Sequence, residues 1–239
     1  MGQQEAQQVS AQLPMLNDPQ INNYVNALGQ SIARTTSRAD LDWHFAVVNS
    51  DVVNAFALPG GFVYVNRGVL SRASNESELG GVLGHEIEHV VRRHSVQQMQ
   101  QAQGANTAAG ILCVLTTICE NQVASAAIQV GGAAVFAKFS RTDEMQADEG
   151  GFKNEMNAGL NPTGMLTLFQ KLLAEEKGGS SAVSAWFSDH PGTEDRIADV
   201  QRMLQQVPPA TLARLRTNST AFNSMKSRLA QLPPAPKAR

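Results

Sequence analysis

The pentapeptide His85-Glu86-Ile87-Glu88-His89 contains the residues of this chain whose types and spacing best fit a chemical function. Two histidines four residues apart on a helix project from the same face, so one nitrogen of each imidazole can reach a single metal ion. Glu86 flanks that face, where its carboxylate can take a proton from a water molecule that the metal polarises. The pattern predicts a catalytic metal site, provided that a helix surrounds it and a third ligand exists.

The third ligand is expected in the segment 140–148. Zinc in hydrolytic sites typically has three protein ligands and keeps its fourth position for water or substrate. Glu144 and Asp148 are four residues apart and share one face of a predicted helix. Glu144 can bind the metal, while Asp148 can accept the second ring N–H of a ligand histidine. The alternative for this pair is a solvated acidic helix face.

The pentapeptide lies inside a predicted helix. Asn75 offers an N-cap side chain and Glu78 follows three residues later, which is the capping-box pattern. Apolar residues then recur at helical spacing, and helix is plausible to about residue 100. His94 would lie about 140° around this helix from His89 and so cannot share its metal. We expect His94 to have a structural role or to form a polar contact to the helical hairpin expected at about residues 100–138.

The other elements are short strands and amphipathic helices. Residues 43–48 and 61–66 have the composition of strands, and Pro59 with two glycines forces a turn between them. Helices are predicted over most of residues 1–40 and over 140–157, 163–176 and 193–206. The sequence therefore predicts an α+β fold that is mostly helical, with a small antiparallel sheet.

The composition is that of an ordinary globular protein, with 42% hydrophobic and 17% charged residues. A formal net charge of −2 and the lack of a basic run argue against nucleic acid as a partner. The length fits one domain. We place it at residues 1–207, followed by a C-terminal helix and a Pro-rich tail at residues 208–239.

Residues 104–137 are apolar and almost uncharged. We expect a helical hairpin inserted at about residues 100–138 and packed on the domain. The alternative is a surface that associates with a membrane or forms oligomers. Cys113 and Cys119 lie here, and they are either buried thiols or a short-loop disulfide.

The N-terminal residues are polar and show no signal peptide. This start fits a cytosolic protein, or an exported protein whose export segment has been removed. The sequence leaves both compartments open.

Four motifs in order resemble the M48 family of zinc metallopeptidases, and within it the LoiP-like and BepA-like bacterial branch. They are Asn54-Ala-Phe-Ala-Leu-Pro-Gly-Gly61, His85-Glu-Ile-Glu-His89, Ser140-Arg-x-x-Glu144-x-x-Ala-Asp148 and Ser188-Asp-His190-Pro191. The resemblance implies a gluzincin-like zincin domain whose sheet packs on the His-Glu-x-x-His helix. It also implies a protein of the bacterial periplasm or envelope that acts in protein quality control.

The resemblance implies a role for each matching residue. His85, His89 and Glu144 match the ligands of one Zn²⁺ per chain, Glu86 matches the general base, and Asp148 matches the acid that orients a ligand histidine. The chain is then expected to be a zinc metalloendopeptidase that cleaves misfolded or envelope proteins. The alternative is a chaperone-like or membrane-associated assembly factor without proteolytic activity.

The segment Asn54–Leu58 resembles the edge strand above the zinc in this family. A polypeptide substrate would add to it as a further strand, held mainly by main-chain hydrogen bonds. The residues implied in substrate binding are Asn54, Ala55, Phe56, Ala57 and Leu58.

His190 has two readings that the resemblance leaves open. It can be a fourth zinc ligand from a covering loop, which would keep the enzyme latent until the loop moves. It can instead stabilise the oxyanion of the tetrahedral intermediate. A third reading, from the residues alone, is a surface loop histidine that caps the next helix. Arg196 on that helix can face the same cleft.

Overall fold

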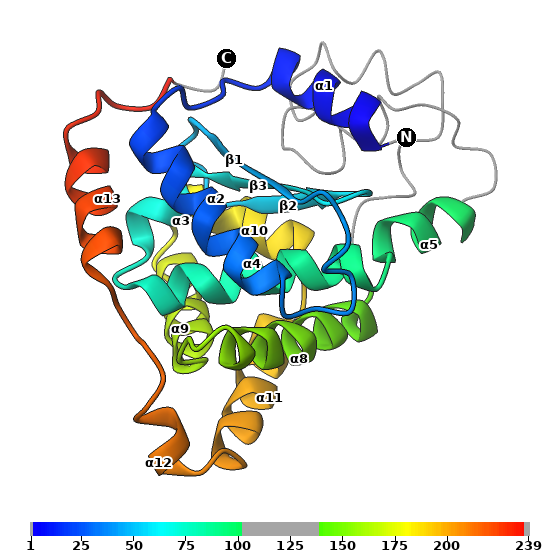
Figure 1. Cartoon of the computed structure of the whole chain (residues 1–239), viewed down its shortest axis with the longest axis vertical. Coiled ribbons are helices and arrows are strands. Elements are labelled where there is room, and N and C mark those ends of the chain that lie inside the picture. Colours follow the sequence, from blue (N-terminus) through cyan, green and yellow to red (C-terminus); the bar gives the residue numbers. More distant parts are fainter. Residues whose placement is uncertain (1, 102–138, 237–239) are drawn as a thin grey trace.

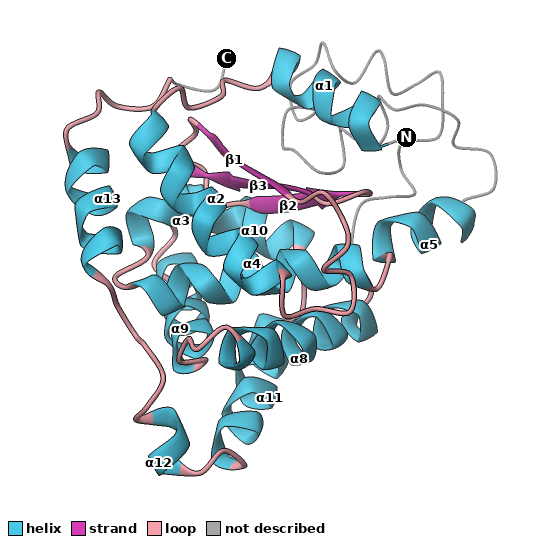
Figure 2. Ribbon diagram, viewed as in Figure 1, coloured by secondary structure: helices cyan, strands magenta, loops and turns pink. Residues whose placement is uncertain are grey.

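The computed structural model describes residues 2–101 and 139–236, which form an α+β fold with helices around one small sheet (Figures 1 and 2). The first part contains α1 (Gly2–Gln12), α2 (Pro19–Ala33), β1 (His44–Val48), β2 (Ala55–Leu58), β3 (Phe62–Asn66), α3 (Arg67–Arg72), α4 (Glu76–Val91) and α5 (His94–Gln101). The second part contains α8 (Arg141–Asn157), α9 (Thr163–Lys177), the short 3₁₀ helix η3 (Ser181–Val183), α10 (Ser184–Asp189), α11 (Thr193–Gln205), α12 (Pro209–Leu212) and α13 (Thr220–Ala230). The predicted fold class is confirmed.

The sheet has the strand order β1-β3-β2 and is mixed, not wholly antiparallel as predicted. β2 and β3 form an antiparallel hairpin, and its turn uses Gly60 and Gly61 at φ 96° and 101°, a backbone conformation that favours glycine. β1 instead pairs with β3 in parallel. The chain passes from β1 to the opposite edge before the hairpin reverses it, so β1 and β3 run in the same direction.

The two faces of β2 pack against different helices because side chains alternate along a strand. Phe56 and Leu58 join a small apolar cluster with Val9 of α1. Ala55 and Ala57 belong to the main core, on the side of α4. Two alanines leave little bulk between strand and helix, so β2 lies close over α4 (Figure 1).

The helix that carries the pentapeptide begins at the predicted N-cap residue but ends earlier than predicted. Asn75 caps it by accepting a hydrogen bond from the Glu78 amide at 3.0 Å. The Glu78 carboxylate, however, accepts from the amide of Ser74, so the reciprocal capping box is shifted by one residue. The helix also stops at Val91 and not near residue 100, because Arg93 has a left-handed φ of 59°. No glycine or proline marks this break in the sequence.

Glycines bring α4 and α8 into close contact. A Cβ atom on Gly151 would lie 2.9 Å from the backbone of Gly84, so only glycine fits at this crossing. Gly84 directly precedes His85, and Gly151 lies about one turn beyond Asp148. The crossing therefore sets the two helices side by side where their polar residues face each other (Figure 1).

The C-terminal residues contribute to the same core as the rest of the chain. Phe222, Met225 and Leu229 of α13 are buried in the main apolar cluster. Beyond α13, the carbonyl of Pro233 accepts a hydrogen bond from Arg67 at 2.6 Å. The boundary at residue 207 stays a prediction.

Glu155 of α8 is fully buried, and neither carboxyl oxygen has a hydrogen-bond partner among the residues that the structure describes. Burial raises its pKa well above the usual value. A native pKa above the unfolded one lowers stability as pH rises through that range. We expect Glu155→Met to raise the free energy of unfolding at pH 8 by about 1–3 kcal/mol, measured by urea denaturation.

The gain should shrink at pH 5, where the carboxyl of both the folded and unfolded chain holds its proton more often. Glu149→Gln, on the exposed side of the same helix, serves as the matched control. A gain for Glu155→Met that is equal at the two pH values would contradict the assignment.

None of the described helices is long and apolar enough to cross a membrane. The predicted hairpin at about 100–138, its apolar stretch 104–137 and both cysteines lie outside the described residues. Membrane association or oligomerisation through that stretch stays a prediction.

Candidate metal centre

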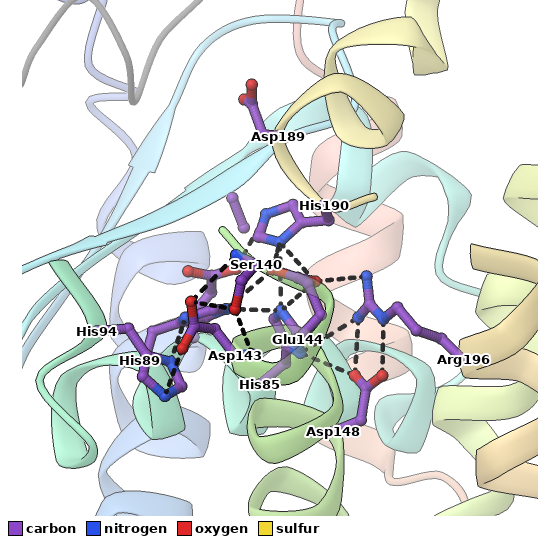
Figure 3. Close-up of polar contacts among 12 residues, drawn as sticks. His85, His89, His94, Ser140, Asp143, Glu144, Asp148, Asp189, His190 and Arg196 are labelled. Carbon is purple, nitrogen blue, oxygen red and sulfur yellow. Dashed lines mark hydrogen bonds and ion pairs between the residues drawn. The ribbon is translucent and has the colours of Figure 1, made fainter. Parts of the chain in front are cut away.

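Three elements bring four potential metal ligands together. α4 supplies His85 and His89, α8 supplies Glu144, and the residue after α10 is His190 (Figure 3). One ligand atom of each lies within 4.8 Å of every other, and all four residues are buried. The residues that the sequence assigned to the metal therefore meet in space, and His190 meets them.

The distances between the potential ligand atoms fit a single metal ion. The Nε2 atoms of His85 and His89 are 3.0 Å apart. Each lies 3.5 Å from one carboxylate oxygen of Glu144. Ligand atoms that lie ~2.0–2.1 Å from a tetrahedral zinc ion are ~3.3 Å from one another. Two nitrogens and a carboxylate at these separations are a donor set for a metal such as zinc.

Asp148 fixes the orientation of His85. Its Oδ1 lies 2.8 Å from Nδ1 of His85, so this nitrogen donates its proton to the carboxylate. The lone pair of Nε2 is then directed at the cluster. This is the arrangement that metal-binding histidines usually have, and it is the contact that the sequence predicted for Asp148.

Arg196 of α11 holds both carboxylates of α8. Its Nε and Nη2 donate to Asp148 at 2.6 and 2.7 Å, and its Nη1 lies 2.7 Å from Glu144 (Figure 3). Burial alone would raise the pKa of both acids, but the guanidinium and nearby histidines outweigh it and hold each pKa below its usual value. Glu144 and Asp148 are therefore ionised, as a metal ligand and its support must be.

Glu86 lies next to the ligand atoms, with its Oε1 atom 3.5 Å from Nε2 of His190. Its side chain is buried, and Oε1 makes no hydrogen bond to any described residue. Burial raises the pKa of this carboxyl, opposed in part by His190 and His85. A carboxyl whose pKa is shifted toward neutrality suits the transfer of protons.

His190 occupies the open side of the cluster. Its Nδ1 lies 3.2 Å from Nε2 of His85 and 3.3 Å from both oxygens of Glu144, while its Nε2 lies 3.5 Å from Glu86. Burial would lower the pKa of this imidazole, but the Glu144 carboxylate and other charges raise it to about 9. The reading of His190 as a surface loop residue is wrong, since its exposed fraction is 2%.

The segment that carries His190 is attached to the start of β2. The side-chain amide of Asn54 donates a hydrogen bond to Asp189 at 2.8 Å, and the amide of Val53 donates to Ala182 at 2.8 Å. The ring of His190 also packs on Trp186, with ring centroids 4.6 Å apart. The position of His190 thus depends on contacts at both α10 and the sheet.

β2 is an edge strand, as the family resemblance implied for the segment Asn54–Leu58. Ala55, Phe56, Ala57 and Leu58 pair with β3 on one side, and no described strand pairs with the other side. A cavity of about 190 Å³ lies beyond Leu58 and reaches His89, with its walls formed by Arg38, Leu58, Pro59, Gly60, His89, Val90, Arg93, Ser95 and Val96.

Although His94 makes polar contacts and is not among the four potential ligands, as expected, the predicted offset of about 140° between His94 and His89 is wrong. Their Nδ1 atoms are 2.9 Å apart, because the chain turns at Arg93 instead of continuing the helix. Phe139 was also missed, and its ring stacks on that of His89 with centroids 3.9 Å apart. Neither contact has a signal in the residue spacing, since His94 follows a turn at Arg93 and Phe139 lies far from His89 in the sequence.

The remaining polar residues lie outside the cluster. Glu88 accepts hydrogen bonds from Asn154 of α8 and from Arg92, which agrees with the predicted contact to a second helix. His44 pairs with Asp42 at an exposed position on β1.

Comparison with known proteins assigns the chain to a family of peptidases. Residues 19–204 match peptidase family M48. The chain is 31% identical over 215 residues to the beta-barrel assembly-enhancing protease of Escherichia coli (strain K12), a match that covers 87% of this chain and 44% of that protein. The chain thus spans less than half the length of this relative.

Two further relatives carry metalloprotease names. The mitochondrial metalloendopeptidase OMA1 of Schizosaccharomyces pombe is 29% identical over 77% of this chain and 53% of its own length. The metalloprotease LoiP of Escherichia coli (strain K12) is 28% identical over 76% of this chain and 68% of its own.

Proposed function

We propose that this chain, which belongs to peptidase family M48, is a zinc-dependent metalloendopeptidase. Two of the relatives described above carry the names of metalloproteases. One observation carries this proposal. The buried cluster of His85, His89 and Glu144 has the spacing of a zinc donor set, and beside it lies an oxygen of Glu86 that accepts no hydrogen bond from the described residues. A scaffold protein would have no use for such a carboxyl.

In the proposed reaction, His85, His89 and Glu144 hold the ion and Glu86 moves the protons. A bound zinc ion would act as a Lewis acid that makes a water molecule acidic near neutral pH. Glu86 takes a proton from this water and later gives it to the leaving amine. Asp148 and Arg196 keep His85 and Glu144 in place during these steps. No covalent bond between protein and substrate is required.

The proposed substrate is an extended polypeptide that adds to β2. The outer edge of this strand offers backbone donors and acceptors directly above α4, and main-chain hydrogen bonds would bind many sequences. The cavity beyond Leu58 has the size for one substrate side chain. Broad specificity toward unfolded chains follows.

We place the protein in the bacterial periplasm or envelope, where misfolded or envelope proteins would be its substrates. Support comes from the name of one relative, which links it to the assembly of β-barrels, the form that outer-membrane proteins take. Fractionation of the source cells, with the chain traced by antibody, tests this placement.

The experiment for the proposed activity is digestion of an unfolded protein such as casein by the purified chain. A zinc chelator should abolish cleavage, and one equivalent of Zn²⁺ should restore it, whereas Mg²⁺ should not. Cleavage that persists at full rate after the chelator has removed all metal would overturn the proposal. Binding of casein without cleavage would favour the chaperone-like alternative.

We further propose that His190 is a latch and not an oxyanion stabiliser. Its Nδ1 lies within 3.3 Å of atoms of the proposed ligands His85 and Glu144. The imidazole therefore fills the position that a substrate carbonyl or a water molecule would need. The loop would have to move before a substrate could enter. Asn54, at the start of β2, holds this segment by its hydrogen bond to Asp189. A substrate that binds along β2 could break this hydrogen bond and so release His190.

The substitution His190→Ala should raise the rate of casein cleavage roughly tenfold, the effect of destabilising the closed form by ~1.4 kcal/mol. Zinc content should not change. Asp189→Ala, which removes the contact to Asn54, should raise the rate by a smaller factor. A fall in rate for His190→Ala would show that the imidazole acts in the transition state instead.

A further inference from the structure

We propose that His94 is a positioning residue for the metal site: it accepts the Nδ1 proton of His89, and Gln146 fixes the direction of that hydrogen bond. His89 would thereby present Nε2 to the metal. The inference rests on the proposed metal centre and extends it to a second supporting contact. It concerns a residue that the spacing of the sequence excludes from the site.

The contacts of His94 define a short chain of hydrogen bonds. Nδ1 of His94 lies 2.9 Å from Nδ1 of His89, and Nε2 of His94 lies 3.2 Å from Oε1 of Gln146 (Figure 3 shows the two histidines). Oδ1 of Asp143 lies 3.7 Å from the same Nε2 atom. His94 is 1% exposed, so no bulk water competes for these positions.

The partners of His94 assign its proton. Both oxygens near Nε2 accept hydrogen bonds, and the carboxylate of Asp143 can do nothing else. Nε2 of a neutral His94 therefore carries the proton, and its Nδ1 is a free acceptor.

The proton position on His94 also determines the proton position on His89. A bond between two Nδ1 atoms requires one donor and one acceptor, so Nδ1 of His89 is the donor. Its Nε2 then carries the lone pair, and this is the atom 3.0 Å from Nε2 of His85. Both ligand histidines thus aim a lone pair at the same point, which a cation would stabilise.

The two ligand histidines differ in what supports them. His85 donates to Asp148, a carboxylate held by Arg196, whereas His89 donates to a neutral imidazole. A second buried carboxylate beside His89 would add negative charge to a site that already contains Glu144 and Glu86. His94 supplies the acceptor without that charge. Its ring can do so only because the chain turns at Arg93.

The test measures the zinc dissociation constant of the metal-free protein by competition with a chromophoric chelator. Loss of an outer hydrogen-bond partner typically weakens metal binding by roughly 10–100-fold, and we expect this for His94→Leu. His94→Asn keeps an acceptor oxygen close to the position of Nδ1 and should restore most of the affinity. His44→Leu, at the exposed histidine of β1, is the matched control and should bind zinc like the parent.

Gln146 provides variants that leave the buried ring in place, since this side chain is only partly buried. In Gln146→Glu the carboxylate can only accept the hydrogen bond from Nε2 of His94, so zinc affinity should be preserved. Gln146→Lys can only donate and should weaken it, because it favours the opposite proton position on His94. Nitrogen NMR shifts of the histidine rings should show Nε2 of His94 protonated in the parent and more Nδ1 protonation in Gln146→Lys.

Equal zinc affinity for the parent, His94→Leu and Gln146→Lys would overturn the inference while leaving the metal site intact. A parent protein that binds no zinc would overturn the metal site itself, and the inference with it. Protonation of Nδ1 of His94 in the parent would also contradict the proposed direction.

Discussion

Glu86→Gln should lower the rate of casein cleavage by ~100- to 10,000-fold, the usual contribution of a general acid–base group. Glutamine has nearly the same shape but cannot take a proton from water or return one to the leaving amine. Glu86 is not one of the proposed ligands, so zinc content should equal that of the parent. The rate is measured with fluorescently labelled casein, and zinc is measured on the same samples.

Glu88→Gln is the matched control, since it makes the same change two residues further along α4. Glu88 contacts Asn154 and Arg92, away from the cluster, so its variant should cleave at the parent rate. Cleavage by Glu86→Gln at the parent rate would remove Glu86 from the mechanism. Loss of zinc from this variant would make it a structural residue of the site.

Glu144→Gln should weaken zinc binding by ~100- to 1,000-fold. This is the effect of losing one ligand from a site whose apparent binding free energy is ~10–16 kcal/mol over four ligands. The amide carries no negative charge, and it also leaves Arg196 with Asp148 as its single carboxylate partner. Zinc content after dialysis and the dissociation constant from chelator competition measure the loss.

Asp148→Asn gives the comparison that separates a ligand from its support. It should retain a weakened site, with a loss of roughly 10–100-fold, because the metal would keep all three of its ligands. Zinc affinity that is unchanged by Glu144→Gln would contradict the ligand assignment. An equal loss in both variants would indicate that the ion pairs with Arg196 matter more than direct ligation.

The local chemistry of this protein was predictable from its sequence. The spacing of His85 and His89 places both rings on one helix face. Ser140, where the second helix was predicted to start, is the N-cap residue of α8. β2 (Ala55–Leu58) is an edge strand, as the resemblance implied for the segment Asn54–Leu58. These features depend on helix and strand geometry, which acts over a few residues and leaves a pattern in the chain.

Features that depend on chain direction were less predictable. The parallel pairing of β1 with β3 follows from the route between the strands, and alternation of side chains is the same in either direction. The end of α4 was missed because Arg93 takes a left-handed conformation that glycine would ordinarily mark. The predicted position of His94 was wrong for the same reason, because this residue follows the turn at Arg93.

The sequence by itself determined the candidate donors, their helix and the likeness to peptidase family M48, because residue types and short spacings define them. Only the tertiary structure decided what surrounds the donors. The crossing of α4 and α8 at Gly84 and Gly151 places Glu144 opposite the histidines, and α11 brings Arg196 to Asp148. His190, which follows α10, and His94, the first residue of α5, reach the cluster from other segments. Their distances to the donors depend on packing between distant segments, which no local spacing encodes.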